Sequence, residues 1–328
     1  MGLLIAGVDE AGYGPLLGPL SVGLSVLRIE GWEEGAPAPD LWEMLPRSVA
    51  RTLKGAGDRV MVADSKELKL PNSAVRRHPL THLERGVLTW LDIAGHRPTD
   101  DAGVVDALGT EWPEARWYGG EPLRSPVAWS PGQIAIAANP LREDLTRAGI
   151  SVAAMACRVI GENEFNALVR EGGGKGATTI AGVKGHFHTA MNIAASSPGD
   201  GVRFVCDRLG GRVQYADVVA DFAGVGVSDV RVVEETEVRS RYFVGVGGRQ
   251  VGVVFQVESE KVHLPIALAS MTAKYVREMA MIRFNRFWGG RVEGLRPTAG
   301  YWQDAKRWLK DAGGVLTAEE RRGLVRIA

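Results

Sequence analysis

The first apolar run of the chain, residues 3–8, is rich in branched side chains, and two acids, Asp9 and Glu10, follow it directly. A short run of this kind is typical of a buried strand. Gly12 and Gly14 come next and end the strand, because glycine favours turns. The pattern therefore predicts a strand whose end carries two adjacent carboxylates.

Strand and helix patterns continue along the rest of the chain. Residues 19–29 nearly alternate apolar and polar side chains, which predicts a second strand, antiparallel to the first. Gly247-Gly248 separates two alternating runs and predicts a hairpin. The other predicted strands are residues 150–160, 202–207, 230–234, 241–246 and 250–257. Helices are predicted from Thr81 to about Ile93 and over residues 317–327, with capping boxes at Thr81-x-x-Glu84 and Thr317-x-x-Glu320.

Two carboxylates at the end of a buried strand repel each other. At a separation of about 4 Å the repulsion is roughly 4 kcal/mol when the effective dielectric constant is near 20. A divalent metal ion is the simplest group that offsets it. Because successive strand side chains point to opposite faces, Asp9 is the favoured first ligand, and Glu10 joins it only if the backbone turns there. The alternative is a solvated strand end followed by a turn.

Composition limits the classes of function. The 328 residues suffice for one large domain or two smaller ones. Lys and Arg together number 39, as do Asp and Glu, so a nucleic-acid site must be a local basic patch. Cys157 and Cys206 are the only cysteines, which indicates a reducing compartment and chemistry without thiols. No apolar run suits a membrane span or a signal peptide, so we expect a cytoplasmic protein without membrane association.

Four strings in the sequence, taken in order, resemble the ribonuclease HII and HIII family. The first is IAGVDEAGYGP at residues 5–15, followed by Gly18-Pro19. The others are Asp64-Ser65-Lys66, LPIALASMTAKYVRE at residues 264–278, and PTAGY at residues 297–301. Between the second and third strings, Asp207 ends a predicted strand, as the third catalytic acid of that family does. The order of the strings makes the set more specific than any member alone.

The resemblance implies a fold and an activity. The fold would be α/β, an RNase H-like mixed β-sheet flanked by helices. The catalytic core would occupy residues 1–260, with insertions at about 95–150 and 236–258. A C-terminal helical segment, residues 261–328, would complete the active site and the substrate groove. The implied activity is hydrolysis of the RNA strand of RNA/DNA hybrids by two-metal-ion catalysis.

The resemblance also implies the roles of single residues. The catalytic acids and metal ligands would be Asp9, Glu10, Asp207 and Glu278. They would hold two ions, and oxygen ligands favour Mg²⁺ or Mn²⁺ over Zn²⁺. The residues implied to bind substrate are Gly12, Tyr13, Gly14, Ser65, Lys66, Lys274 and Tyr301. The substrate would be an RNA/DNA hybrid or DNA containing ribonucleotides, and we expect the protein to act as a monomer.

Three residues depart from the family pattern. Tyr13 stands between two glycines where ribonuclease HII usually has Arg, Arg208 follows Asp207 where Gly is usual, and Glu278 replaces Asp. Because Tyr13 removes a cation, we expect weaker preference for a single embedded ribonucleotide than for a longer hybrid. These departures leave two alternatives open. One is a catalytically weak or inactive protein that binds hybrids or junctions, and the other is a structure-specific DNA nuclease on the same fold.

Overall fold

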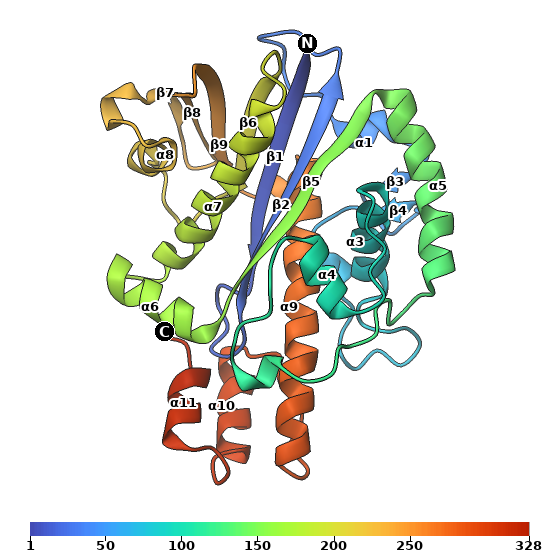
Figure 1. Cartoon of the computed structure of the whole chain (residues 1–328), viewed down its shortest axis with the longest axis vertical. Coiled ribbons are helices and arrows are strands. Elements are labelled where there is room, and N and C mark those ends of the chain that lie inside the picture. Colours follow the sequence, from blue (N-terminus) through green and yellow to red (C-terminus); the bar gives the residue numbers. More distant parts are fainter. Residues whose placement is uncertain (328) are drawn as a thin grey trace.

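A seven-stranded mixed sheet lies at the centre of the computed structural model, which describes residues 1–327 (Figure 1). The strand order is β5-β2-β1-β6-β9-β8-β7. These strands are β1 (Gly2–Ala11), β2 (Leu20–Glu30), β5 (Ile150–Ile160), β6 (Gly201–Asp207), β7 (Arg231–Glu235), β8 (Arg239–Val246) and β9 (Arg249–Gln256). A separate parallel pair is formed by β3 (Val49–Ala50) and β4 (Val60–Met61).

Helices flank the sheet, which confirms the predicted α/β class with its helical C-terminal segment. The α-helices are α1 (Leu41–Met44), α2 (Ser65–Leu68), α3 (Thr81–Ile93), α4 (Asp101–Ala107), α5 (Pro131–Ala148), α6 (Glu162–Gly172), α7 (Gly176–Ala195), α8 (Ala216–Ala223), α9 (Leu264–Arg291), α10 (Trp302–Asp311) and α11 (Ala318–Leu324). The 3₁₀ helices are η1 (Arg116–Tyr118), η2 (Val227–Asp229) and η3 (Ser259–Lys261). Across residues 1–327, no helix has the length and apolar character that crossing a membrane requires.

The first two strands are antiparallel, as predicted, but β1 is longer than its apolar run. Pairing with β2 continues through Glu10 opposite Val22 and Ala11 opposite Ser21. Both acids therefore lie within the strand instead of after it. The reason is that β2 extends alongside them, which an apolar pattern in β1 alone does not reveal.

The predicted hairpin is also present, and it joins the main sheet. Strands β8 and β9 are antiparallel around Gly247-Gly248, and β9 lies parallel to β6. The sheet therefore continues from the first strands into the hairpin. The proposed domain division at residue 260 and the two proposed insertions stay predictions.

The alternation of β1 sorts its side chains between two cores. Leu3 and Ile5 belong to the cluster on the α9 face, whereas Leu4, Ala6 and Val8 belong to the cluster on the α7 face. Helix α9 runs behind β1 and β2 in Figure 1, and α7 runs in front of the sheet. A strand with both faces buried in this way reads as a continuous apolar run, which is the pattern of residues 3–8.

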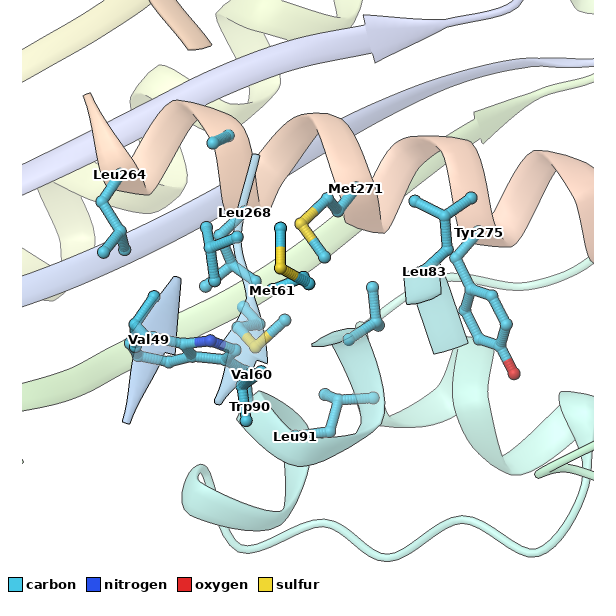
Figure 2. Packing of buried hydrophobic residues seen from close by; sticks show 14 of the residues in the cluster. Val49, Val60, Met61, Leu83, Trp90, Leu91, Leu264, Leu268, Met271 and Tyr275 are labelled. Carbon is cyan, nitrogen blue, oxygen red and sulfur yellow. The ribbon is translucent and has the colours of Figure 1, made fainter. Parts of the chain in front are cut away.

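On the α9 side, a third layer covers the helix. Figure 2 shows Leu268, Met271 and Tyr275 of α9 directed toward Leu83 and Trp90 of α3. All five residues are 0% exposed. Helix α9 is therefore buried between the sheet and α3 over this part of its length, which is why most of its residues there are apolar.

Helix α3 has the predicted bounds, but the capping box proposed for it is wrong. The N-cap residue is Leu80, without a side-chain cap, and the Thr81 hydroxyl donates to the His78 carbonyl. Glu84 is buried and accepts from the backbone N–H groups of Val127 and Ala128 at 2.7 and 2.6 Å. The Glu84 carboxylate therefore binds a loop that is distant in sequence and does not cap the helix. The second proposed box, Thr317 with Glu320, is confirmed.

Two glycines let α9 approach the sheet. A Cβ on Gly7 of β1 would lie 2.4 Å from the carbonyl carbon of Pro265, and one on Gly23 of β2 would lie 2.2 Å from the Ala269 oxygen. Between them, the Ser25 hydroxyl donates to the Pro265 carbonyl at 2.6 Å. Backbone of α9 is thus in direct contact with backbone of the sheet, and no larger side chain fits there.

We expect Gly23→Ala to lower the free energy of unfolding by about 1–3 kcal/mol, because the added methyl forces α9 away from β2. The measurement is urea unfolding at equilibrium. Gly245→Ala is the matched control, since Gly245 is also a strand glycine but has nothing within 4 Å of an added Cβ. Equal losses in the two variants would contradict the close seating of α9.

Candidate active site

Two carboxylates converge because β1 and β6 are parallel neighbours. Their last register pair is Val8 with Cys206, and Asp9 and Asp207 follow on the two strands. Both acids continue the sheet face that carries α9, so they meet at the carboxyl edge of the sheet. Glu10 points to the opposite face, but it lies near enough to the strand end to reach the same cavity.

This cavity has a volume of about 230 Å³. It brings together every residue implied by the resemblance except Glu278. Those residues are Asp9, Glu10, Gly12, Tyr13, Gly14, Ser65, Lys66, Asp207, Lys274 and Tyr301. Asp64, Glu260 and Ser270 also line it. Residues from the two ends of the chain thus share one site, while their chemical roles remain predictions.

The acids raise one another's pKa. Burial is the main cause of the high pKa of Asp9, and repulsion from Glu10 and Asp207 adds to it. Burial, followed by repulsion from Asp207, raises the pKa of Glu10 to about 7. Burial also raises the pKa of Asp207, although hydrogen bonds from Ser259 oppose the rise. Without a cation among them, Glu10 titrates near neutral pH, and the raised pKa values of Asp9 and Asp207 favour their protonated forms.

Lys66 places a positive charge in the same cavity as this cluster. It lies on α2, whose N-cap residue is Asp64, and the Asp64 carboxylate accepts from the Lys66 backbone N–H at 2.8 Å. The Lys66 ammonium partly offsets the rise in the pKa values of Glu10, Asp207 and Glu260. Its side chain is exposed, so it stands where an incoming anion can meet it.

Two serines join α2 to α9 beneath the cavity. The Ser270 hydroxyl donates to that of Ser65 at 3.0 Å, and both residues are buried. The Ser270 hydroxyl also favours the charged form of Asp9. Lys274 lies one helical turn after Ser270 and lines the same cavity. Helix α9 therefore carries both a neutral and a cationic group to the acids.

Glu278 lies apart from the other predicted acids. Its carboxylate is 3.0 Å from the Lys274 ammonium and 3.7 Å from that of Lys69. Burial alone would raise the pKa of Glu278, but Lys274, Lys69 and Arg277 together hold it below its usual range. Lys274 and Glu278 therefore form an i,i+4 ion pair along α9. The carboxylate is neutralised by lysines and does not line the cavity of Asp9.

Glu260 is an acid of this site that the sequence analysis missed. It is 8% exposed and lies in η3, directly after Ser259, whose N–H and hydroxyl donate to Asp207 at 3.3 and 3.0 Å. Burial and then repulsion from Asp207 raise the pKa of Glu260. The signal for it is indirect: since β9 lies parallel to β6, the residues after β9 arrive at the edge where β6 ends.

Arg326 is a second residue that the sequence analysis missed. Its guanidinium donates to the carbonyls of Gly12 at 2.6 Å and Tyr13 at 2.8 Å, and its N–H donates to the Leu16 carbonyl at 3.0 Å. The side chain is buried, and burial together with repulsion from Arg277 lowers its pKa to about 9. The C-terminal segment thus fixes the loop that forms one wall of the cavity.

Gly12 needs its glycine for two reasons. Its φ angle is +96°, which other residues rarely adopt. A Cβ there would also lie 2.4 Å from Nε of the buried Arg277. The Arg277 guanidinium donates to the Ala299 carbonyl at 3.0 Å and lies 5.7 Å from the Tyr301 ring. The loop of Gly12 and the segment before Tyr301 therefore pack around one buried cation.

A larger open cavity of about 640 Å³ adjoins the first. The two share Glu10 and Tyr13. The larger one is also lined by Lys184, Arg212 and glycines 172–174 and 176. The two cavities together therefore extend from the acids to the space between α7 and the segment after β6.

The donor chemistry at the acids suits a hard divalent cation, because carboxylate oxygens are its preferred ligands. Repulsion among Asp9, Glu10 and Asp207 also favours such a cation. Yet among the side chains of residues 1–327, no three Asp, Glu, His or Cys groups are positioned to hold one metal ion together. The residue types therefore fit a divalent cation. Their side chains, however, do not converge on one ion position, which is consistent with their mutual repulsion.

No family profile matches the sequence, and no curated protein matches it. Solved structures do resemble the chain. Ribonuclease H2 from Pyrococcus horikoshii OT3 is 13% identical with a TM-score of 0.40, over 98% of this chain and 92% of that one. A chain of the PCNA:RNase HII complex from Archaeoglobus fulgidus is 12% identical with a TM-score of 0.39, over 99% and 94%. Bst-RNase HIII in complex with Mn²⁺ is 16% identical with a TM-score of 0.39, over 99% of this chain and 66% of that one.

These similarities extend over nearly the whole chain, but their TM-scores are low. They carry no weight for the function of this protein.

We expect the free energy of unfolding in EDTA to fall as the pH rises from about 4.5 to 7, the interval between the usual and the raised pKa of Glu10. The folded state favours protonated Glu10, so ionisation costs the folded protein more than the unfolded chain. Glu10→Gln removes this linkage. From pH 5 to pH 8 the variant should lose about 1–2 kcal/mol less than the parent, after allowance for partial solvent screening.

The measurement is urea unfolding at both pH values. Glu67→Gln is the control, because Glu67 is an exposed acid of α2 outside the cavity. It should follow the parent protein. If Glu10→Gln also follows the parent, Glu10 is not held among the other acids.

Proposed function

We propose that the protein is a metal-dependent endonuclease that hydrolyses the RNA strand of RNA/DNA hybrids. The observation that carries this proposal is the meeting of Asp9, Glu10 and Asp207 in one cavity with Lys66 and Lys274. Clustered acids beside lysines suit phosphodiester hydrolysis, which needs cations near the acids and positive charge near the phosphate. No nucleophilic Ser or Cys lines this cavity with a His beside it.

The acids would bind two Mg²⁺ or Mn²⁺ ions, which supply an activated water and stabilise the leaving oxygen. Asp9, Glu10 and Asp207 are the ligands in this proposal, and Glu260 takes the fourth position that the resemblance assigned to Glu278. Ionisation of the carboxyl groups is required for this, and the high pKa of Glu10 makes it dependent on pH. Binding a cation would remove the repulsion among the acids.

Other residues of the cavity would hold the substrate. Lys66, exposed beside the acids, suits contact with the phosphate next to the scissile bond. The backbone from Gly12 to Gly14, held by Arg326, suits recognition of 2′-hydroxyl groups. Tyr301 is 50% exposed at the start of α10, so its ring is free to stack on a sugar or a base.

A protein that binds hybrids without cutting them is the second candidate. Two observations favour it. Glu278 is neutralised by lysines, and among residues 1–327 no three acids surround one cation position. Such a protein would keep the basic residues and Tyr301 for recognition while its acids remain protonated.

The test of the proposed activity is cleavage of three labelled duplexes with Mg²⁺ or Mn²⁺: a full RNA/DNA hybrid, DNA with one ribonucleotide, and all-DNA. We expect the hybrid to be cut best. Asp9→Asn should reduce the rate by roughly 100-fold or more, since a metal site contributes several kcal/mol to the transition state. Binding without cleavage by the parent protein would support the second candidate. Cleavage of DNA alone would exclude both.

Glu260 and Glu278 give a second test, because they are the same residue type in different surroundings. We expect Glu260→Gln to reduce cleavage by about tenfold or more, in the range of lost metal-site groups. Glu278→Gln should change the rate less, while lowering the free energy of unfolding because two partly buried lysines lose their partner. Initial rates and urea unfolding measure both effects. A larger rate loss in Glu278→Gln would restore the original assignment.

A further inference from the structure

A cavity of about 490 Å³ lies on the sheet beside α9, outside the candidate active site. Helix α9 packs over β1 and β2 and leaves the same face of β6, β9 and β8 partly open. Arg203 and Val205 of β6 line this cavity, and Asp207 is the next residue of β6 on that face. The cavity and the acids therefore share one face of one strand.

The cavity carries an excess of positive charge. Arg203, Arg239 and Arg241 all line it. Arg239 and Arg241 share a single acid, Glu234, at 2.9 and 3.0 Å. The Arg203 guanidinium instead donates to the Ala36 carbonyl at 2.6 Å and lies 5.7 Å from the Trp32 ring, and neither contact neutralises its charge. Three guanidinium groups and one carboxylate thus give a net charge of about two, which attracts anions.

Neighbouring titratable groups do not cancel this charge. His263 lines the cavity, and burial together with Arg203 and Arg239 lowers its pKa to about 4, so it is neutral at physiological pH. Asp40 acts on His263 from the α1 side, but its carboxylate is 2.8 Å from the Arg51 guanidinium. The positive charge is therefore a property of the cavity as a whole.

The remaining lining suits the other part of an anionic ligand. Val205 and Val254 form an apolar floor, Phe243 contributes an aromatic ring, and the Gln256 amide supplies polar atoms. A cavity of this volume is in the range that accepts a ligand of nucleotide size. Guanidinium groups recognise phosphate through paired hydrogen bonds, and an apolar floor with an amide accommodates a flat heterocycle.

We propose that this cavity binds a nucleoside phosphate unit, with Arg203 and Arg241 on the phosphate and the base over Val205 and Val254. The unit is either a free nucleotide or one nucleotide of a single strand. Arg203 and Asp207 are four residues apart on β6, about 13 Å at the usual rise per residue. The cavity is thus distinct from the acids, and the inference does not rest on the proposed nuclease activity.

The test is a binding measurement on the whole protein in EDTA. EDTA removes divalent cations, so the acid cluster cannot bind a phosphate group through a metal ion. The probes are inorganic phosphate, adenosine 5′-monophosphate and a labelled oligothymidine strand, followed by calorimetry or fluorescence anisotropy. Arg203→Gln and Arg241→Gln should each weaken binding about tenfold, the effect of losing one charge-assisted hydrogen bond. Arg147→Gln is the matched control, because this arginine of α5 also pairs with one acid but lies outside the cavity.

Glu234→Gln gives a prediction in the opposite direction. Removing the acid that Arg239 and Arg241 share should tighten binding several-fold, and an unfolded variant could not produce such a gain. Arg241 is 44% exposed at its side chain, so its substitution leaves the core intact, which thermal unfolding verifies.

Arginine-dependent binding of the mononucleotide supports a free nucleotide as the ligand. Arginine-dependent binding of the strand alone supports one nucleotide of a nucleic acid. Phosphate binding as tightly as the nucleotide would overturn the assignment of the floor to a base. If no probe binds, or if Arg203→Gln and Arg147→Gln behave alike, the site is overturned. The cleavage assay on the duplexes is independent of each of these outcomes.

Discussion

The contact between α9 and the first two strands is the constraint on which the rest of the structure depends. The helix lies close enough that backbone meets backbone at Gly7 and Gly23, because neither residue has a side chain. At this separation, Ser270 and Lys274 reach the cavity of Asp9. If a methyl group at either glycine pushed the helix outward, α9 would lose its contacts with the sheet and with the acids. The packing of α9 on the sheet therefore also determines the geometry of the candidate site.

Repulsion among the acids opposes the packing that brings them together. The parallel arrangement of β1 and β6 carries Asp9 and Asp207 to the same edge, and burial with mutual repulsion raises the pKa values of the acids. The fold tolerates this cost because strands and α9 hold the residues on many other contacts. A cluster of this kind is unstable as charged groups and becomes stable by taking up protons or cations. Its chemistry follows from that imbalance.

The wall of the cavity is assembled from both ends of the chain. Arg326 donates to the carbonyls of Gly12 and Tyr13, more than three hundred positions away in sequence. A second buried arginine, Arg277, lies between that loop and Ala299. Two buried guanidinium groups thus order this loop, together with its own Leu16 and Leu17, which belong to a buried apolar cluster. The arrangement places a backbone surface beside the exposed ring of Tyr301 in the same cavity.

Local pattern was sufficient to predict the seven strands of the main sheet, the hairpin and the bounds of α3, because alternation and apolar runs depend on neighbouring residues alone. Which strands pair was not encoded locally. The parallel contact of β9 with β6 brings Glu260 to Asp207, and the close fit of α9 and α2 turns Glu278 toward Lys69. The capping box at Thr81 failed for the same reason, since a distant loop binds Glu84. Such contacts depend on which surfaces the whole chain buries together, so only the tertiary structure decided them.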